Sequence, residues 1–305
     1  MNTTVFVEDF KKTTTKIRLN IPTVYKKNAT VELLKSSVLI AVSGALRVYI
    51  ACLLLQTQPS IITCIAGGLI IYSVYTLDRS LDSEEDVINR KELSGSKKEI
   101  GIAASVITFL IGSYVLAKEG MLAVAFLPLI IGYLYSKGIK IGKFTFRLKG
   151  GLGIKNVVVG ITWGIFIAWL ACNTCKSVIS IVLVFILYGI KTGINSVIDD
   201  FKDVNGDALT GLKTLPVTLG ERNTHRLLTS LHIITHLILG IALILKLIAY
   251  EPLVLLSSFI CGLICIQRYT KEDYTSIQKV GSTFFKDGES TITIILRGIA
   301  GTFFV

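Results

Sequence analysis

Residues 177–198 read SVISIVLVFILYGIKTGINSVI, and Lys191 is the only charged side chain in this stretch. About 20 apolar residues in an α-helix cross the hydrocarbon core of a bilayer. The segment Ile181–Leu187 has no polar residue, whereas the strands of a membrane barrel alternate apolar and polar positions. Because helices and closed barrels are the two structures that satisfy backbone groups in lipid, this stretch predicts a membrane-spanning helix.

Eight further stretches of the chain have the same character. Overall, 51% of the residues are apolar, 17% are charged, and the mean hydropathy is +0.65. This composition excludes a disordered chain and a disulfide-stapled secreted domain. We expect an all-α, multi-spanning helix bundle, with a polar N-terminal segment over residues 1–32 and a membrane domain over residues 33–305. The nine predicted spans are 36–56, 60–77, 100–117, 121–136, 153–171, 177–198, 227–245, 249–265 and 289–305.

Lysine and arginine are distributed unevenly between the two sides of this arrangement. With residue 1 in the cytoplasm, 25 of the 32 basic residues fall in cytoplasmic segments, three in outer loops and four within spans. Basic residues concentrate in the cytoplasmic loops of membrane proteins. The pattern therefore predicts a multi-pass protein of the cell membrane with a cytoplasmic N-terminus. The net charge of +11 fits this topology and contact with anionic membrane lipids, and it requires no nucleic-acid partner.

Acidic residues gather at the cytoplasmic ends of two spans. Asp78-Arg-Ser-Leu-Asp-Ser-Glu-Glu-Asp follows the second span, and Asp199-Asp-Phe-Lys-Asp-Val-Asn-Gly-Asp follows the sixth. In each cluster an Asp recurs at every fourth position, so the carboxylates share one helix face. A solvated acidic loop explains one such cluster. Two clusters with the same spacing favour a shared Mg²⁺ site, because Mg²⁺ is commonly held by one or two carboxylates together with substrate phosphates.

The second cluster also resembles the motif of a known family. From Asn195 to Gly220 the chain reads NSVIDDFKDVNGDALTGLKTLPVTLG, which resembles the second Asp-rich motif of the UbiA superfamily of intramembrane prenyltransferases. The first cluster resembles that family's first Asp-rich motif. Tyr135-Ser-Lys-Gly-Ile-Lys140 resembles its Tyr/Lys motif, in a register that begins at Tyr133 or Tyr135. The resemblance extends from about residue 35 to the end and implies a UbiA-like bundle of nine helices.

This resemblance implies a membrane-bound enzyme that transfers a prenyl group from a prenyl diphosphate, with geranylgeranyl diphosphate as the expected donor, to a lipophilic acceptor. Ionisation of the allylic C–O bond requires the departing diphosphate to be neutralised, which metal ions and cationic side chains accomplish. The residues expected to act are Asp78, Asp82, Asp199 and Asp203 as Mg²⁺ ligands and catalytic residues, Tyr135 as a catalytic residue, Arg79, Lys137, Lys140 and Asn195 as diphosphate binders, and Asp86 and Asp207 as second choices for the metal.

Two features near the first motif bear on the acceptor. The family often has Asn and Asp four and three residues before the first Asp, where this chain has Val74 and Tyr75. An Arg-Pro-x-x-x-Gly segment that commonly follows is also missing. Family members that prenylate glyceryl phosphate lipids usually keep both features, so we expect an apolar or aromatic acceptor, such as a quinone-type lipid precursor. The alternatives are a glyceryl phosphate lipid precursor, terpene cyclisation without an acceptor and, outside the enzymes, a membrane transporter.

Basic side chains inside the spans are costly and usually face a cavity or a partner. Lys191 precedes Asn195 by four residues and therefore shares its helix face. Arg47 lies near the middle of its span, and we expect it to be buried. Lys155 is expected either to be buried or to snorkel to the inner interface.

Two histidines lie on one face of the seventh span. His232 and His236 have the i, i+4 spacing that can bind a metal. The sequence nearby offers no third ligand, so we expect these side chains to hydrogen-bond between helices instead.

Overall fold

The computed structural model describes residues 28–81, 93–136, 139–141, 144–146, 153–172, 175, 177–209, 211–271 and 276–303. Helices dominate this part of the chain, and two three-residue strands form the remaining regular structure. The elements are α2 (Ala29–Lys35), α3 (Val38–Leu55), α4 (Ile61–Ser80), α6 (Lys98–Lys118), α7 (Leu122–Ser136), β1 (Ile139–Ile141), β2 (Phe144–Phe146), α8 (Ile154–Ala171), α9 (Val178–Leu209), α10 (Leu215–Ile244), α11 (Pro252–Tyr269) and α12 (Ser276–Phe303).

Each of the nine apolar stretches coincides with a helix, which confirms the all-α, multi-spanning class. Within the described residues, seven helices are long and apolar enough to cross a membrane, with α2 and α3 taken together as one. The helix α7 is apolar but shorter, and α12 contains the charged residues Lys286, Asp287 and Glu289 near its middle. The count of nine membrane spans therefore stays a prediction.

Several helices extend beyond the apolar stretches that predict them. The helix α9 continues past residue 198 to Leu209, and α12 begins at Ser276 instead of residue 289. The helix α10 begins at Leu215, with Pro216 in its first turn, and is interrupted at Gly220, where φ is 73°. A helix satisfies its own backbone hydrogen bonds in water as well as in lipid. The length of an apolar run therefore underestimates the length of the helix.

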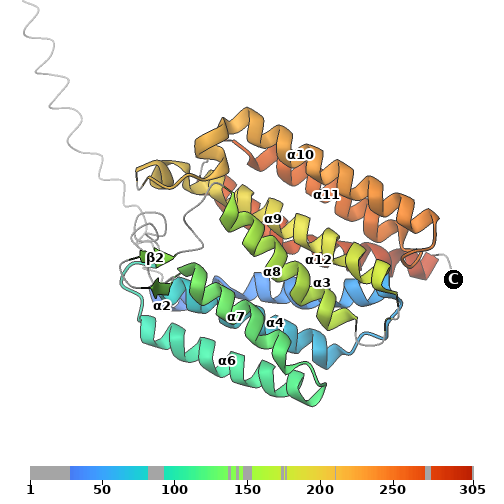
Figure 1. The fold of residues 1–305 in the computed structure, drawn as a ribbon, viewed down its shortest axis with the longest axis horizontal. Helices are drawn as coiled ribbons and strands as arrows, with labels where there is room; N and C mark the ends of the chain where they lie inside the picture. The colour runs from blue at the N-terminus through green and yellow to red at the C-terminus, as the bar shows by residue number, and fades with distance from the viewer. Residues whose placement is uncertain are drawn as a thin grey trace, which may run out of the picture.

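The helices lie side by side with their polar ends gathered at one end of the bundle. Figure 1 shows α4, α6 and α7 on one side, α10 and α11 on the other, and α3, α8, α9 and α12 between them. The C-terminal ends of α4 and α9, which carry the two Asp clusters, lie at the same end as the antiparallel β1–β2 pair. The fold therefore brings both clusters to one end of the bundle.

Apolar side chains cover both the inside and the outside of the bundle. The central core lies between α3, α4, α8 and α9, where Phe166 and Ile167 are almost fully buried. On α6, by contrast, Ile107 and Leu110 are more than half exposed. An exposed apolar surface of this kind suits contact with lipid, as expected for a multi-pass membrane protein.

The closest helix contact is a seam of glycines between α8 and α9. Gly160 and Gly164 on α8 face Gly189 and Gly193 on α9, and both pairs have the i, i+4 spacing. A Cβ added at Gly160 would lie 2.6 Å from the carbonyl oxygen of Gly189, and one added at Gly164 would lie 3.0 Å from the Gly189 Cα. Small residues at this spacing let membrane helices approach backbone to backbone. We refer to these four residues as the glycine seam.

We expect Gly160→Ala to separate α8 from α9, because the added methyl group meets backbone that cannot rotate away. Overpacking of this kind costs about 1–3 kcal/mol, so the melting temperature in detergent should fall. Gly240→Ala in α10 is the matched control, because a Cβ there has no neighbour within 4 Å. Alanine is favoured over glycine in helices by about 1 kcal/mol, so this control should melt at the same or a higher temperature. Equal melting of both variants would contradict the close seam.

Candidate functional site

Asp199 lies between two lysines at the polar end of the bundle. Its Oδ1 accepts a hydrogen bond from Lys202 Nζ at 2.7 Å, and its Oδ2 accepts one from Lys286 Nζ at 2.5 Å. Lys202 also donates to Thr283 on α12 at 3.1 Å. The Asp199 side chain is 43% exposed, whereas that of Lys286 is 6% exposed. The carboxylate is therefore open on one side and held by cations on the other.

A second ion pair crosses from α9 to α12 two helical turns deeper in the bundle. Lys191 pairs with Glu289; the side chain of Lys191 is 11% exposed and that of Glu289 is 9% exposed. Lys191 Nζ also donates to Ser258 Oγ on α11 at 2.6 Å. The positions 191, 195 and 199 lie on one face of α9, so both ion pairs belong to the same contact between α9 and α12. We call the pairs Asp199–Lys286 and Lys191–Glu289 the polar ladder.

The two histidines of α10 extend this polar contact toward the outside. His236 Nε2 lies 3.1 Å from Ser258 Oγ, and its Nδ1 donates to the backbone carbonyl of His232 at 2.9 Å. His232 Nε2 donates to the carbonyl oxygen of Phe259 on α11 at 3.0 Å. The expectation of hydrogen bonds between helices is therefore confirmed for both histidines.

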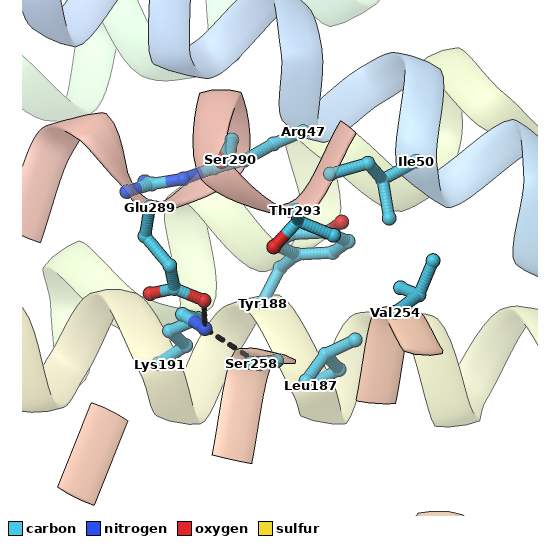
Figure 2. A pocket seen from close by; sticks show the side chains of 10 residues that line it. All are labelled: Arg47, Ile50, Leu187, Tyr188, Lys191, Val254, Ser258, Glu289, Ser290 and Thr293. Atoms are coloured by element: carbon cyan, nitrogen blue, oxygen red, sulfur yellow. Dashed lines mark hydrogen bonds and ion pairs between the residues drawn. The ribbon is translucent and has the colours of Figure 1, made fainter. Parts of the chain in front are cut away.

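A small cavity opens beside the inner pair of the ladder. Figure 2 shows Lys191 and Glu289 on one side of it and Tyr188 and Thr293 near its centre. Arg47 reaches it from α3, with its guanidinium group on the Glu289 side. The cavity thus combines two basic side chains, one carboxylate and several hydroxyl groups.

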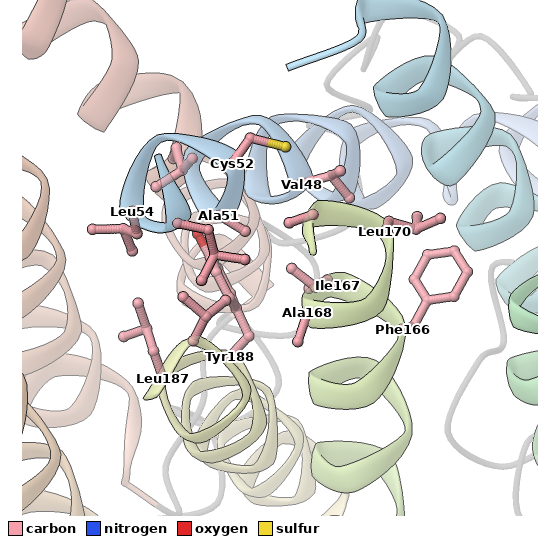
Figure 3. Close-up of a cluster of buried hydrophobic side chains, with 14 of the residues drawn as sticks. Val48, Ala51, Cys52, Leu54, Phe166, Ile167, Ala168, Leu170, Leu187 and Tyr188 are labelled. Atoms are coloured by element: carbon pink, nitrogen blue, oxygen red, sulfur yellow. The ribbon is translucent and has the colours of Figure 1, made fainter. Parts of the chain in front are cut away.

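The apolar core begins directly beside this cavity. Tyr188 and Leu187 line the cavity and also belong to the core cluster formed with α3 and α8, as Figure 3 shows. From α8, Phe166 and Leu170 complete that cluster on the side away from the ladder. The site therefore has a polar end next to an apolar interior, which is the combination that a charged head group on a hydrocarbon tail requires.

The first Asp cluster begins at the end of α4, next to an aromatic pair. The Tyr75 ring stacks on Trp163 of α8, with ring centroids 5.6 Å apart and planes at 12°. Arg79 lies with its guanidinium carbon 5.6 Å from the centre of the same Tyr75 ring, and its Nη1 donates to Ser37 Oγ at 2.6 Å. Asp78 is partly exposed beside Arg79. This end of α4 thus presents an acid, a base and an aromatic face.

Tyr75 lies three residues before Asp78 and also packs against the central core cluster. The aromatic pair therefore joins the start of the first motif to the core of the bundle. Of the other expected residues, Asp82, Asp86 and Lys137 lie outside the described residues, and nothing is described of the side chains of Tyr135 and Lys140.

Asp200, the neighbour of Asp199, points to the opposite helix contact. Its carboxylate is buried and accepts hydrogen bonds from Lys155 Nζ at 2.5 Å and from Asn156 Nδ2 at 2.9 Å. Lys155 is only 9% exposed, so of its two expected positions the buried one is correct. Asp200 joins α9 to α8 and is not directed at the ladder.

The second motif has further polar atoms in the region of Asp199. The Nδ2 atom of Asn195 is buried and has no hydrogen-bond partner within the described part of the protein. Asp203 is partly exposed one turn beyond Asp199, and Asp207 is buried. No three His, Cys, Asp or Glu side chains converge as a metal site among the described residues. Mg²⁺ needs fewer protein ligands than that, and the carboxylates of Asp78, Asp199 and Asp203 are of the type it prefers.

The apolar runs do not predict the contribution of α12. They indicate a span that begins at residue 289 and leave Lys286 and Asp287 outside it, yet Lys286, Asp287 and Glu289 are all buried against the bundle. The signal was the spacing: Lys286 and Glu289 are three residues apart and share a helix face that continues to Thr293. Charged residues can lie there because α9 supplies opposite charges to Lys286 and Glu289, and Asp287 lies 4.0 Å from Lys286.

Comparison with known proteins places this geometry in context. A model of the UbiA prenyltransferase family matches residues 54–286. A digeranylgeranylglyceryl phosphate synthase from Natronomonas pharaonis is 27% identical over 120 residues, which cover 39% of this chain and 43% of the relative. The enzyme of the same name from Haloquadratum walsbyi is 31% identical over 87 residues, which cover 28% of this chain and 30% of the relative. The chain thus spans less than half the length of these curated relatives.

Solved structures share the fold over most of their length. A UbiA homologue from Archaeoglobus fulgidus, bound to GPP and Mg²⁺, matches with a TM-score of 0.60 at 14% identity, covering 87% of this chain and 99% of that one. The structure of a digeranylgeranylglyceryl phosphate synthase matches with a TM-score of 0.53 at 18% identity, covering 90% of this chain and 95% of that one. At these identities the likeness establishes the fold.

We expect Lys191→Met to destabilise the protein strongly, because Glu289 would keep a buried charge without its partner. Breaking a buried ion pair in this way costs about 3–5 kcal/mol. Replacing both residues by Met should restore much of the loss in melting temperature. Arg297→Met is the matched control: its pair with Glu251 is more exposed, and such pairs contribute about 0–1 kcal/mol. A double variant that melts no higher than Lys191→Met would contradict the pairing.

Proposed function

This chain belongs to the UbiA prenyltransferase family, and from that membership we propose that it transfers a prenyl group from a prenyl diphosphate to a lipophilic acceptor within the membrane, with Mg²⁺ as its cofactor. Family membership, shown over residues 54–286, argues for an enzyme and against the transporter alternative. The observation that carries the proposal is that the C-terminal end of α4, where the first Asp motif begins, and that of α9, which carries the second, lie at one end of an apolar bundle.

The residues of this chain fit the charge changes of the reaction. When bound, Mg²⁺ supplies positive charge to the departing diphosphate; Asp78, Asp199 and Asp203, together with Asp82, are the carboxylates proposed to hold it. Lys286 and Arg79 add charge-assisted donors for phosphate oxygens. Asn195 Nδ2, which has no partner within the described part of the protein, offers a neutral donor. Lys202 and Lys286 already lie beside the Asp199 carboxylate, so the surroundings of this carboxylate favour a positive charge.

The aromatic pair suits the other half of the reaction. The bond between the allylic carbon and the diphosphate oxygen breaks with both electrons leaving on diphosphate, and the carbon is left with positive charge. An aromatic face stabilises a nearby cation by about 0.5–2 kcal/mol. Tyr75, three residues before Asp78, and Trp163 form an aromatic pair near the first motif. The acceptor then forms the new bond to this carbon and loses its proton, so that the products are the prenylated acceptor and diphosphate.

The relatives bear on the acceptor. The two curated relatives are named digeranylgeranylglyceryl phosphate synthase. These names favour a glyceryl phosphate lipid precursor, the alternative to our expectation of an apolar or aromatic acceptor. We therefore take the glyceryl phosphate precursor as the first candidate and geranylgeranyl diphosphate as the donor. The aromatic acceptor remains the second candidate, because Tyr75 replaces an acid near the first motif and stacks on Trp163, leaving the site richer in aromatic surface. The distribution of basic residues favours a site on the cytoplasmic side.

To identify the acceptor, we propose that membranes containing the protein be supplied with labelled geranylgeranyl diphosphate and a panel of acceptors. The panel contains geranylgeranylglyceryl phosphate, hydroxybenzoate, dihydroxynaphthoate and a hydroxyphenazine. Preferential labelling of the glyceryl phosphate is expected. Preferential labelling of an aromatic acid would reverse the order of the two candidates. Diphosphate release that needs no acceptor would instead indicate cyclisation or hydrolysis.

A second prediction tests the carboxylates. Asp78→Asn and Asp199→Asn should each lower Mg²⁺-dependent diphosphate release by at least about 100-fold, because each removes a carboxylate proposed to hold Mg²⁺ beside the leaving diphosphate. Glu119→Gln is the matched control, since this exposed acid lies next to α6 at the opposite end from the motifs. Melting temperatures separate loss of chemistry from loss of fold. Near-normal turnover in both Asp variants would refute the assignment.

A further inference from the structure

Arg47 is buried in the bundle with part of its guanidinium group unused. The residue is 6% exposed, and its Nε and Nη2 atoms have no hydrogen-bond partner among the described residues. It lies in the middle of α3, a helix whose other residues carry no charge. A charge in such a place is costly and normally faces a partner or a functional cavity.

The nearest carboxylate does not neutralise this arginine. Glu289 lines the same cavity but is paired with Lys191. The lining therefore contains two cations, Arg47 and Lys191, and one carboxylate, Glu289, which leaves one positive charge. Hydroxyl groups of Tyr188 and Thr293 face the same space. The cavity is thus suited to an anion that carries further hydrogen-bonding oxygens.

The two unused atoms define the shape of that anion. Nε and Nη2 lie on one edge of a guanidinium group and can grip two oxygens of a phosphate or a carboxylate at once. The same chain shows this arrangement at Arg297, whose Nε and Nη2 donate to the two carboxylate oxygens of Glu251 at 2.9 and 2.7 Å. Arg47 has the same pair of donors available and no such acceptor among the described residues.

The position of Arg47 separates it from the donor's diphosphate. Asp199 lies eight residues beyond Lys191 on α9, or about 12 Å along a helix, and has Lys202 and Lys286 beside it. Figure 2 shows the Arg47 side chain extending to the Glu289 side of the cavity. Arg47 lines the cavity beside Lys191, whereas Asp199 is not among the residues that line it. The arginine therefore lies deeper in the bundle than the carboxylate proposed to hold Mg²⁺.

We infer that Arg47 binds the anionic head group, a phosphate or a carboxylate, of the acceptor. This inference rests on the proposed prenyl transfer. It adds that the acceptor carries an oxyanion and that Arg47 selects acceptors by binding it. Both candidate acceptor classes include molecules with such a group. Arg47 supplies the cationic contact that a glyceryl phosphate head group needs, in addition to the cations around the donor's diphosphate.

The test compares Arg47→Gln and Arg47→Lys with the wild-type protein, all full length and in lipid nanodiscs. Loss of a charge-assisted bidentate contact should raise the KM for geranylgeranylglyceryl phosphate by roughly 10- to 100-fold. The KM for geranylgeranyl diphosphate should not change. Geranylgeranylglycerol, which lacks the phosphate, should react equally with the wild-type protein and Arg47→Gln. Arg47→Lys should retain part of the affinity, because it keeps the charge without the two-pronged geometry.

Each alternative has its own result. A higher KM for the donor would assign Arg47 to the diphosphate and overturn the inference. An effect confined to hydroxybenzoate would identify a carboxylate as the oxyanion and support it. A purely structural role predicts a lower melting temperature for Arg47→Gln and equal losses with every acceptor. Removal of a buried charge that lacks a partner should instead leave melting unchanged or raise it. Arg297→Gln, whose guanidinium is engaged by Glu251, is the matched control and should leave the KM for the acceptor unchanged.

A direct binding measurement keeps this inference separate from the proposed function. If the wild-type protein transfers prenyl groups to no acceptor, the proposed function fails. Protection of the protein against heat by geranylgeranylglyceryl phosphate can still be measured. Protection of the wild-type protein and not of Arg47→Gln would support Arg47 as the oxyanion contact. Equal protection of both, or of neither, would overturn it.

Discussion

A charge buried among membrane helices needs an opposite charge or a polar cavity inside the protein, because lipid supplies neither water nor counter-ions. The polar ladder between α9 and α12 satisfies this requirement twice, through Lys191–Glu289 and Asp199–Lys286. It allows α12 to enter the bundle although its middle is charged. It also fixes Asp199, and with it the second motif, against α12. The fold of the C-terminal helix and the geometry of the site thus depend on the same contacts.

Much of this architecture follows from the sequence. Helical spans are encoded by uninterrupted apolar runs, because lipid permits few other structures, and each predicted run coincides with a helix. The two Asp clusters fall at helix ends on one side of the bundle, as their spacing and the distribution of basic residues indicate. The family assignment from the second motif is confirmed, whereas the role of Asp199 as a metal ligand stays a prediction.

Other features could not be read from one sequence, because they depend on which helices become neighbours. Asp199 and Asp200 are adjacent in the chain, yet one meets Lys286 on α12 and the other meets Lys155 on α8. No local pattern distinguishes them; the direction of each side chain is decided by the helix packed against it. Likewise, Tyr75 was noted only as a departure from a motif. Its value to the site comes from Trp163, which is 88 residues away in the sequence and stacks on its ring.

The glycine seam has a mechanical consequence. At the seam the backbones of α8 and α9 approach each other closely, and Asp200 also joins α9 to Lys155 and Asn156 of α8, so the two helices resist sliding and separation. They behave as a single stiff unit that carries the second Asp motif. Any opening that admits a long hydrocarbon tail must therefore be produced by displacement of other helices around this unit. The Asp residues can keep their spacing while the surrounding wall moves.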